Sequence, residues 1–427
     1  MLTLAFILMF VLLLLGFPMM VPLLIGALAM MLMLLPGVDP TSLIRAMISG
    51  VRPSVLVAVP MFILAADIMT KGHTANRLLD LVHAFLGHRR GGLPITTAVS
   101  CTLFGAVSGS TQATVVAIGS ALRPKMLKAG YKDSFTMALL VNSSDIALLI
   151  PPSIAAIIYG VAASESVGEL FIAGIGPGVL IMVMFSVYSW WISKKLDIPL
   201  GERVGWADRL RALRGAILPM GFPVVVLGGI YSGLFSPTEA AAMSVFYALV
   251  VEMLVYRSVK LSDLPSIALS TGLITAVVFI LVGAGQAFSW VISMAQIPTE
   301  VLGPILDTVA DNPTMLLVVI AVSFFVACMF VDPIVAIFVL TPIFIPAIDA
   351  SGLDPILVGT LVVLQSAIGS ATPPFGYDIF TAMAVFRRPY MEIVKGTPPF
   401  IVMLLATTVL LIMFPQIALF LRDLAFR

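Results

Sequence analysis

Long apolar stretches alternate with short polar ones along the chain, and this pattern predicts membrane-spanning helices. Apolar runs occupy about 2–16, 19–35 and 51–70, and a longer run of about 30 residues covers 93–122. Runs of about 20 apolar residues are long enough to cross the hydrocarbon core of a bilayer. The runs are continuous rather than alternating, which argues against a transmembrane β-barrel. We therefore predict an all-α polytopic membrane protein.

Composition agrees with this fold class. The chain is 60% hydrophobic and 11% charged, far from soluble averages. Its net charge of +1 gives no indication of nucleic-acid binding. Cys101 and Cys328 stand alone in apolar segments and are expected to be free, buried thiols. Residues 1–15 lack a basic region before the apolar run, so we expect a mature helix rather than a cleaved signal.

The chain repeats itself at an offset of 222 residues. Adding 222 to seven Gly or Pro positions of the first half gives the same residue in the second half. The matching pairs are Gly50 and Gly272, Pro124 and Pro346, Gly130 and Gly352, Pro151-Pro152 and Pro373-Pro374, Gly174 and Gly396, and Pro177 and Pro399. Helix breakers repeated at one offset indicate a duplicated membrane fold, which commonly places its site between the two copies.

The segment 93–122 is predicted to be a re-entrant hairpin because both of its flanks are basic. The flanking residues are Lys71, Arg77, Arg89 and Arg90 before it, and Arg123, Lys125, Lys128 and Lys132 after it. The positive-inside rule places both flanks in the cytoplasm. One straight helix of this length would also be about 45 Å long, more than a bilayer core of about 30 Å needs.

The second copy predicts the same hairpin at 314–345 with the opposite orientation. Its flanks are acidic, with Glu300, Asp307 and Asp311 before it and Asp349 and Asp354 after it. The chain therefore divides into a first repeat over 1–193, a cytoplasmic linker over 194–214 and an inverted second repeat over 215–427. This gives about ten spans plus two hairpins, with both termini outside. Arg422 and Arg427 fit an external C-terminus poorly.

Each predicted hairpin is followed by a helix that is interrupted near its middle. The first covers about 134–160 and breaks at Pro151-Pro152-Ser153, and the second covers about 355–386 and breaks at Thr372-Pro373-Pro374-Phe375-Gly376. Consecutive prolines remove backbone donors and leave carbonyl groups free. A bilayer tolerates such backbone only where it lines a cavity or a site. Two hairpin tips and two breaks should therefore meet near the midplane.

Small polar residues at the tips fit a monovalent cation and an anion. Ser108-Gly109-Ser110 offers hydroxyl and carbonyl oxygens for Na⁺, while nearby helix N-termini offer amides for an anion. The alternative is that Ser and Gly merely allow tight helix packing. Asp332 lies at the offset position of Ser110. Its carboxylate is a cation ligand or a cap for the helix that starts at Pro333.

Three further polar residues lie next to the breaks. Asn142 and Asp145 precede the first break and Asp378 follows the second. They are candidates for supporting ion contacts, or they cap half-helices or face a water-filled vestibule. Glu239 reads as the end of a capping box that starts at Ser236. The chain has no Walker motif or nucleotide fingerprint, so uphill transport would have to use an ion gradient.

These motifs resemble the large membrane subunit of the TRAP (tripartite ATP-independent periplasmic) transporters, the DctM-like proteins. The resemblance rests on Ala106-Val107-Ser108-Gly109-Ser110, Ala113-Thr114-Val115, Ile150-Pro151-Pro152-Ser153 and Thr372-Pro373-Pro374-Phe375-Gly376, and covers essentially the whole chain. It implies Na⁺ at Ser108, Ser110, Asp332 and Thr372, with Gly109, Ser153, Gly376 and the prolines at both breaks also in the substrate and ion site. The polar segment 142–145 departs from the family pattern and points to a different substrate group.

The resemblance also implies how the protein works. The family imports small organic anions across the bacterial inner membrane with Na⁺, by an elevator movement and without an organic cofactor. It works with a small four-helix membrane subunit (Q-type) and a periplasmic substrate-binding protein (P-type). A C4-dicarboxylate, sialic acid or a small sulfonate would each fit. The alternatives are an ion channel or a binding-protein-independent Na⁺/anion symporter. An intramembrane enzyme is least favoured, because no nucleophile stands beside a base.

Overall fold

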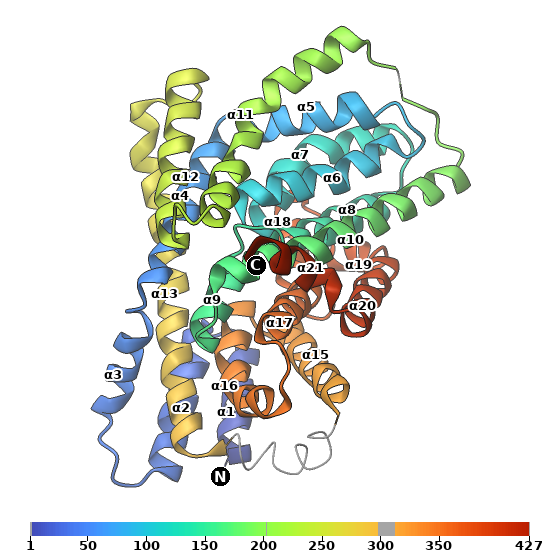
Figure 1. Cartoon of the computed structure of the whole chain (residues 1–427). Coiled ribbons are helices and arrows are strands. Elements are labelled where there is room, and N and C mark those ends of the chain that lie inside the picture. The colour runs from blue at the N-terminus through green and yellow to red at the C-terminus, as the bar shows by residue number, and fades with distance from the viewer. Residues whose placement is uncertain (1, 202, 298–311, 427) are drawn as a thin grey trace.

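The structure is a computed structural model that describes residues 2–201, 203–297 and 312–426. Within these ranges every regular element is a helix, which confirms the predicted all-α class (Figure 1). Glu300, Asp307 and Asp311, the acidic flank of the second predicted hairpin, lie outside the described residues.

The first half contains ten α-helices and two short 3-10 turns within the described residues. They are α1 Leu2–Leu14, α2 Met20–Leu34, α3 Thr41–Gly50, η1 Ser54–Val57, α4 Ala58–Lys71, α5 Thr74–Leu86, α6 Gly92–Ser108, α7 Thr111–Lys128, α8 Asp133–Ser144, η2 Asp145–Leu148, α9 Ile154–Ala163 and α10 Val167–Lys195.

The second half is also helical throughout its regular elements in the described residues. Its elements are α11 Trp206–Tyr231, α12 Pro237–Leu249, η3 Val250–Val255, η4 Leu261–Asp263, α13 Leu264–Met294, α15 Pro313–Phe330, α16 Pro333–Ser351, α17 Pro355–Ser370, α18 Tyr377–Phe386, α19 Tyr390–Val394, α20 Pro398–Met413 and α21 Gln416–Phe426.

Helix boundaries repeat at the offset that the Gly and Pro positions show. Adding 222 to the bounds of α7, 111 and 128, gives 333 and 350, against 333 and 351 for α16. Adding it to α8 with η2, 133 and 148, gives 355 and 370, the bounds of α17. These helix boundaries therefore repeat between the halves, while the inverted orientation of the halves in a membrane stays a prediction.

Local sequence explains where these helices begin. The side chains of Ser110, Ser153, Asp332 and Asp354 cap α7, α9, α16 and α17 by accepting a hydrogen bond from a backbone N–H of the first turn. Pro at the first helical position starts α16 and α17 without the loss of a hydrogen bond. The capping box expected at Ser236 and Glu239 is present at the start of α12.

Two segments that were predicted to flank or link the spans contain helical residues. The polar stretch 71–90 contains α5, which buries Leu78, Leu79 and Val82 on one face. The predicted linker 194–214 contains the end of α10 at Lys195 and the start of α11 at Trp206. In α5 the exposed residues Asn76 and Asp80 lie on the outer face of an amphipathic helix. A count of charges alone therefore makes such a helix look like a loop.

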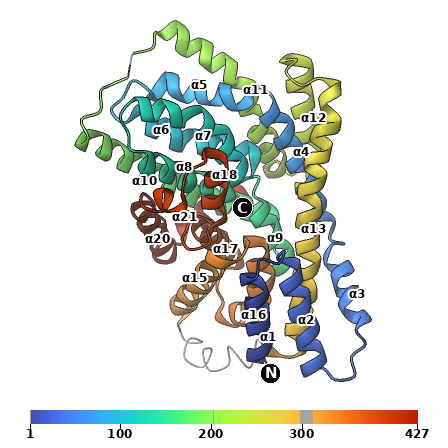
Figure 2. The ribbon, with the colours of Figure 1, turned by 180° about the vertical axis from the view of Figure 1, so that it is seen from behind.

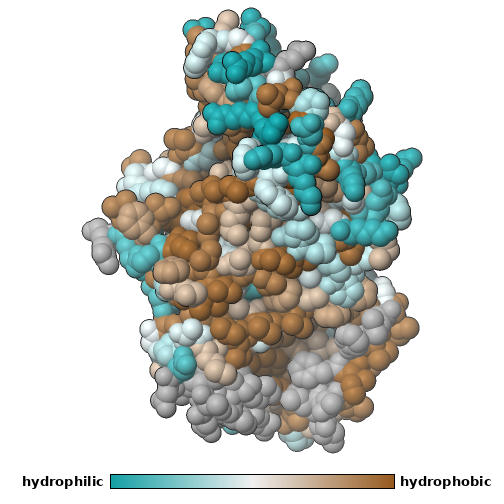
Figure 3. All heavy atoms as spheres, turned by 90° about the vertical axis from the view of Figure 1, so that its right-hand side faces the viewer, coloured by the Kyte–Doolittle hydropathy of each residue, from teal (hydrophilic) through white to brown (hydrophobic). Residues whose placement is uncertain are grey.

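Helix lengths agree with a multi-pass membrane protein. In the described part, seven helices are long and apolar enough to cross a membrane, or up to eight if α20 and α21, bent by 58°, form one span. The arms of the second predicted hairpin, α15 and α16, are among the seven. Figure 3 shows apolar surface across the middle of one face and hydrophilic residues gathered at the upper end. This distribution fits a lipid-facing surface.

Helix packing places the predicted tips and breaks in the interior. The long helix α13 packs against α2, α3 and α4 on one side and against α16 on another (Figures 1 and 2). Helix α9 packs against α16, and α6 packs against α7, α8 and α10. Of the four helices that begin at a predicted tip or break, α16 packs against α13 and α9, and α18 packs against α7.

The C-terminal helix explains how Arg422 is accommodated. Its guanidinium contacts Asp354 at 2.7 Å, Asp423 at 2.7 Å and Glu169 at 3.8 Å. Arg422 was expected to fit an external C-terminus poorly because its positive charge would lack a partner there. Arg422 instead lies among carboxylates that include Asp354, a member of the acidic flank.

Candidate functional site

The turn between α6 and α7 packs directly against the first Pro-Pro break. Gly109 ends α6 in the left-handed region, with φ of 58°. A Cβ atom there would collide with the carbonyl oxygen of Pro152. Only glycine combines this backbone conformation with such a close approach. The tip and the break therefore form one structural unit.

Hydroxyl groups hold the tip together. The Ser108 Oγ lies 3.2 Å from the Thr114 Oγ1, and the Thr114 hydroxyl donates to the carbonyl oxygen of Ser110 at 2.8 Å. The Ser110 Oγ accepts from the backbone N–H of Ala113 at 3.3 Å. Thr114, which was cited only as part of the family motif, is thus a direct partner of both serines.

The first break is closed by Ser153. Its hydroxyl donates to the carbonyl oxygen of Leu148, the last residue of η2, and accepts from the backbone N–H of Ala156 at 3.1 Å. The peptide bond between Pro151 and Pro152 is cis, and both prolines are buried. Ser153 therefore links the end of one half-helix to the start of the next.

The second break has the same order but is more exposed. The Thr372 hydroxyl donates to the carbonyl oxygen of Ile368 at 2.6 Å, and the Gly376 N–H donates to the carbonyl oxygen of Thr372 at 3.1 Å. The peptide bond between Pro373 and Pro374 is cis, and Pro374 is exposed. The Tyr390 hydroxyl donates to the Pro374 carbonyl oxygen at 2.9 Å.

Asp332 forms the turn between α15 and α16. Its Oδ1 accepts from the backbone N–H of Ile334 at 2.8 Å, so the capping role is present. The side chain is only half-buried, because it also borders a cavity. Capping occupies Oδ1 and leaves Oδ2 available, so the two roles predicted for Asp332 are compatible.

One cavity of about 140 Å³ lies where both tips meet the helices that follow both breaks. It is lined by Gly109, Ser110, Thr111, Gln112, Leu148, Ile154, Ala155, Ile274, Val278, Asp332, Pro333, Ile334 and Tyr377. The structure thus brings together three of the predicted site residues, Gly109, Ser110 and Asp332. The others do not line this cavity: Ser108, Pro151, Pro152, Ser153, Thr372, Pro373, Pro374 and Gly376 lie around the tips and breaks that form it.

Four helices begin at the cavity. Its lining includes the first residues of α7, α9, α16 and α18. Each helix N-terminus carries a partial positive charge and free backbone N–H groups. Among the lining residues there is no Lys, Arg or His, and Asp332 supplies the single carboxylate. The cavity can therefore attract an anionic group through helix ends and a cationic group through Asp332.

The cavity also contains residues that the sequence did not single out. Thr111, Gln112 and Tyr377 add polar groups to its wall, and Ile274 and Val278 add an apolar face from α13. Tyr377 stands beside Asp378 in the sequence and could have been noticed as a polar side chain after the break. Ile274 and Val278 are ordinary apolar residues of a long helix and give no such signal.

The three supporting residues lie deeper in the protein. Asn142 and Asp378 are completely buried and Asp145 is 1% exposed. The Asn142 amide donates to the Ala138 carbonyl oxygen at 2.8 Å. Asp145 and Asp378 contact Ser370 and Thr111 respectively. The structure therefore brings Asp145 and Asp378, but not the Asn142 amide, into contact with residues near the tips.

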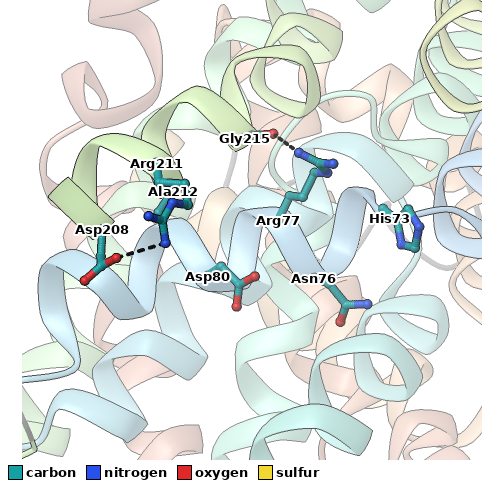
Figure 4. Close-up of a pocket in the computed structure, with 8 residues that line it drawn as sticks. All are labelled: His73, Asn76, Arg77, Asp80, Asp208, Arg211, Ala212 and Gly215. Carbon is teal, nitrogen blue, oxygen red and sulfur yellow. Dashed lines mark hydrogen bonds and ion pairs between the residues drawn. The ribbon is translucent and has the colours of Figure 1, made fainter. Parts of the chain in front are cut away.

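A larger cavity, of about 450 Å³, lies apart from this site (Figure 4). It runs between α5 and α11 and is lined by His73, Asn76, Arg77, Asp80, Asp208, Arg211, Ala212 and Gly215. Arg77 donates to the Gly215 carbonyl oxygen at 3.4 Å, and Asp208 pairs with Arg211 at 3.1 Å. Because it touches none of the tips or breaks, it is a groove between surface helices rather than the candidate site.

Comparison with known proteins identifies the family of this chain. The family model of the tripartite ATP-independent periplasmic transporter, DctM component, matches residues 6–417. The chain belongs to this family. The resemblance that the sequence motifs indicated is confirmed, and the protein is a transport permease of the membrane.

Two relatives match over nearly their whole length. The chain is 63% identical to the ectoine/5-hydroxyectoine TRAP transporter large permease protein UehC of Ruegeria pomeroyi, over 99% of this chain and 98% of that protein. It is 61% identical to the ectoine TRAP transporter large permease protein TeaC of Halomonas elongata, over 97% of each.

A solved structure shows the same fold. The YdaH transporter of Alcanivorax borkumensis superposes with a TM-score of 0.65 at 15% sequence identity, over 93% of this chain and 96% of that one. At this identity the match supports the architecture and says nothing of the substrate.

Proposed function

We propose that this permease imports ectoine or 5-hydroxyectoine together with Na⁺, using substrate delivered by a periplasmic binding protein. The observation that carries the proposal is the convergence of four helix N-termini and one carboxylate on a single cavity. The high identity to two permeases named for ectoine supports this choice of substrate. C4-dicarboxylates and sialic acid, which the sequence left open, do not occur in the names of these two relatives.

The charge of the cavity fits a zwitterion. Ectoine carries a carboxylate and a cyclic amidinium group. Helix N-termini at Ser110 and Ile154 suit the carboxylate, and the Asp332 carboxylate suits the amidinium. A C4-dicarboxylate dianion would instead leave its second charge without a basic side chain among the lining residues.

The coupling ion is proposed to bind beside this cavity. Na⁺ prefers oxygen ligands, and the tips supply the hydroxyl groups of Ser108 and Ser110 and the carboxylate of Asp332. The second break supplies the Thr372 hydroxyl, which lies outside the cavity lining. Binding of Na⁺ would offset the cost of holding the Asp332 charge within the membrane.

An elevator movement is the proposed transport step. All polar groups of the cavity come from the tips and breaks, whereas α13 contributes only Ile274 and Val278 to its lining. A purely apolar wall makes no hydrogen bonds that must break when the tips slide past it. We also propose the two partners that the sequence implied, a small four-helix membrane subunit and the binding protein, in the bacterial inner membrane.

Uptake into proteoliposomes tests this function. The permease, its small subunit and its binding protein would be reconstituted together, and radiolabelled ectoine uptake measured with an inward Na⁺ or K⁺ gradient. We expect saturable uptake that needs both Na⁺ and the binding protein, and that excess succinate or sialic acid leaves unchanged. Uptake without the binding protein would favour an independent symporter. Equal uptake in the K⁺ gradient would overturn Na⁺ coupling.

A further inference from the structure

Two buried aspartates, one from each half of the chain, face each other behind the cavity. Asp145 begins η2 and Asp378 lies in the first turn of α18. Their carboxyl groups lie within hydrogen-bonding reach of one another, and both face the Ser370 hydroxyl. At the offset positions the other half has Ala367 and Ala156. The repeat therefore does not contain a second such pair. The two aspartates meet because the two halves pack against each other.

The hydrogen bonds around the pair are too few for two ionised carboxylates. Asp145 Oδ2 and Asp378 Oδ2 are both buried, and neither has a hydrogen-bond partner in the described part of the protein. The Ser370 hydroxyl contacts Asp145 Oδ1 at 3.1 Å and the Ala367 carbonyl oxygen at 2.7 Å, but its one hydrogen can serve only one of them. The Thr111 hydroxyl donates to Asp378 Oδ1 at 2.8 Å, so the described neighbours supply fewer donors than two carboxylates need.

The described residues around the pair bring no positive charge to it. Among the described residues, the titratable groups that face the pair are Cys101 on α6, Tyr377 on α18 and Asp332 before α16. Two adjacent carboxylates without a cationic partner cannot both stay ionised in a buried site, since each buried charge costs several kcal/mol. One proton between the two carboxyl groups removes one charge and provides the missing donor.

A hydroxyl chain connects this pair to the cavity. The Thr111 hydroxyl uses its hydrogen on Asp378, so the Tyr377 hydroxyl, 3.1 Å away, is the donor to Thr111 Oγ1. Thr111 and Tyr377 both line the cavity. Protons can therefore pass between cavity water and Asp378 through two hydroxyl groups while the carboxylates themselves stay out of solvent.

We propose that Asp145 and Asp378 form a proton-binding site that holds one shared proton at neutral pH and exchanges it with the cavity through Thr111 and Tyr377. This site is separate from the proposed Na⁺ ligands at the tips. A shared proton supplies the donor that the two carboxyl groups lack, and it needs no ligand beyond these two groups. The proposal stands whether or not ectoine is the substrate.

Infrared difference spectroscopy of the purified complex in lipid nanodiscs tests the site. The carbonyl stretch of a protonated carboxylic acid is distinct from the bands of a carboxylate. We expect this band in the wild type at neutral pH, with or without Na⁺, and its loss in alkaline buffer. Asp145→Asn and Asp378→Asn should each abolish it, because the new amide donates to the remaining carboxylate. Asp332→Asn should keep it.

The exchange path has its own test. Tyr377→Phe removes the outer hydroxyl, so the band should stay but lose its proton several-fold more slowly after a jump to alkaline pH. Tyr390→Phe serves as the matched control, because the Tyr390 hydroxyl contacts Pro374 outside the pair. The proposal fails if the wild type lacks the band at neutral pH, or if added Na⁺ removes it, which would assign the site to Na⁺. Equal exchange rates in wild type and Tyr377→Phe would overturn the path.

Discussion

Gly109 and Pro152 approach so closely that no side chain fits between them. Gly109 lies at φ of 58°, and a Cβ would collide with the Pro152 carbonyl oxygen. This contact joins the first tip to the first break and thereby fixes the position of Ser110 at the cavity. It explains why a Gly stands between the two serines of the tip.

Gly109→Ala should therefore damage transport more than folding. The left-handed conformation costs a non-Gly residue about 1 kcal/mol, and the collision forces the tip away from the break. We expect ectoine uptake to fall by about tenfold or more, since about 1.4 kcal/mol corresponds to a factor of ten. Gly352→Ala is the matched control, because Gly352 has φ of 68° but nothing within 4 Å. Similar losses in both variants would show that backbone strain alone is responsible.

Asp332 allows charge and capping to be separated. Asp332→Asn keeps an oxygen that can accept from Ile334 but removes the charge, whereas Asp332→Ala removes both. We expect both variants to need about ten times more Na⁺ for half-maximal uptake. Only Asp332→Ala should also lower the free energy of unfolding, by about 1 kcal/mol as for a lost N-cap. Normal Na⁺ activation in Asp332→Asn would leave Asp332 with a capping role alone.

A partly buried ion cluster should stabilise the packing of α7 and α8 against the end of α18. Asp133 accepts from Arg123 at 2.8 and 2.6 Å and from Arg388 at 3.0 Å, and its side chain is 12% exposed. Asp133→Ala leaves two guanidinium groups without their partner, so we expect a loss of about 2–3 kcal/mol in thermal unfolding.

The exposed pair of Asp208 and Arg211 supplies the control for this measurement. Its side chains are 55% and 81% exposed, and exposed pairs contribute little. Asp208→Ala should change the free energy of unfolding by less than about 0.5 kcal/mol. If the two variants were equally stable, the cluster at Asp133 would contribute no more than an exposed pair.

Short-range signals made the element boundaries predictable from sequence. The breaks at Pro151 and Pro373 and the helix starts at Ser110 and Asp332 depend on backbone rules that act over a few residues. Because the chain repeats at one offset, each of these signals occurs in both halves and supports the same boundary twice. The amphipathic helix α5 was not predicted, because its charged residues indicated a polar stretch and its apolar period was not used.

Long-range contacts within the site could not be predicted in this way. Thr111 and Asp378 are 267 residues apart, and Ser370 and Asp145 are 225 apart. No local rule states that these side chains meet, since the contact depends on how the halves pack. For the same reason the sequence could name Asp145 and Asp378 as candidates but could not identify them as a pair.

The acidic surface near the start of α10 predicts a pH-dependent stability. Burial, and then the neighbouring carboxylates of Glu169, Asp354 and Asp349, raise the pKa of Glu165. The folded protein therefore holds this proton more tightly than the unfolded chain does. The resulting stabilisation is present at low pH and is lost as pH rises through the interval between the unfolded and the folded pKa.

The pKa of Asp39 shifts in the opposite direction, so Asp39 serves as the comparison for Glu165. Its Oδ1 accepts from the Thr41 N–H at 2.9 Å, and this backbone hydrogen bond lowers the pKa of Asp39. Its stabilisation is present at neutral pH and is lost as pH falls. Thermal unfolding between about pH 2 and pH 7 covers both titrations, because Asp39 titrates below the ordinary Asp range and Glu165 above the ordinary Glu range. Relative to wild type, Glu165→Gln should gain stability as pH rises, and Asp39→Asn should lose it. Parallel pH curves for all three proteins would contradict both assignments.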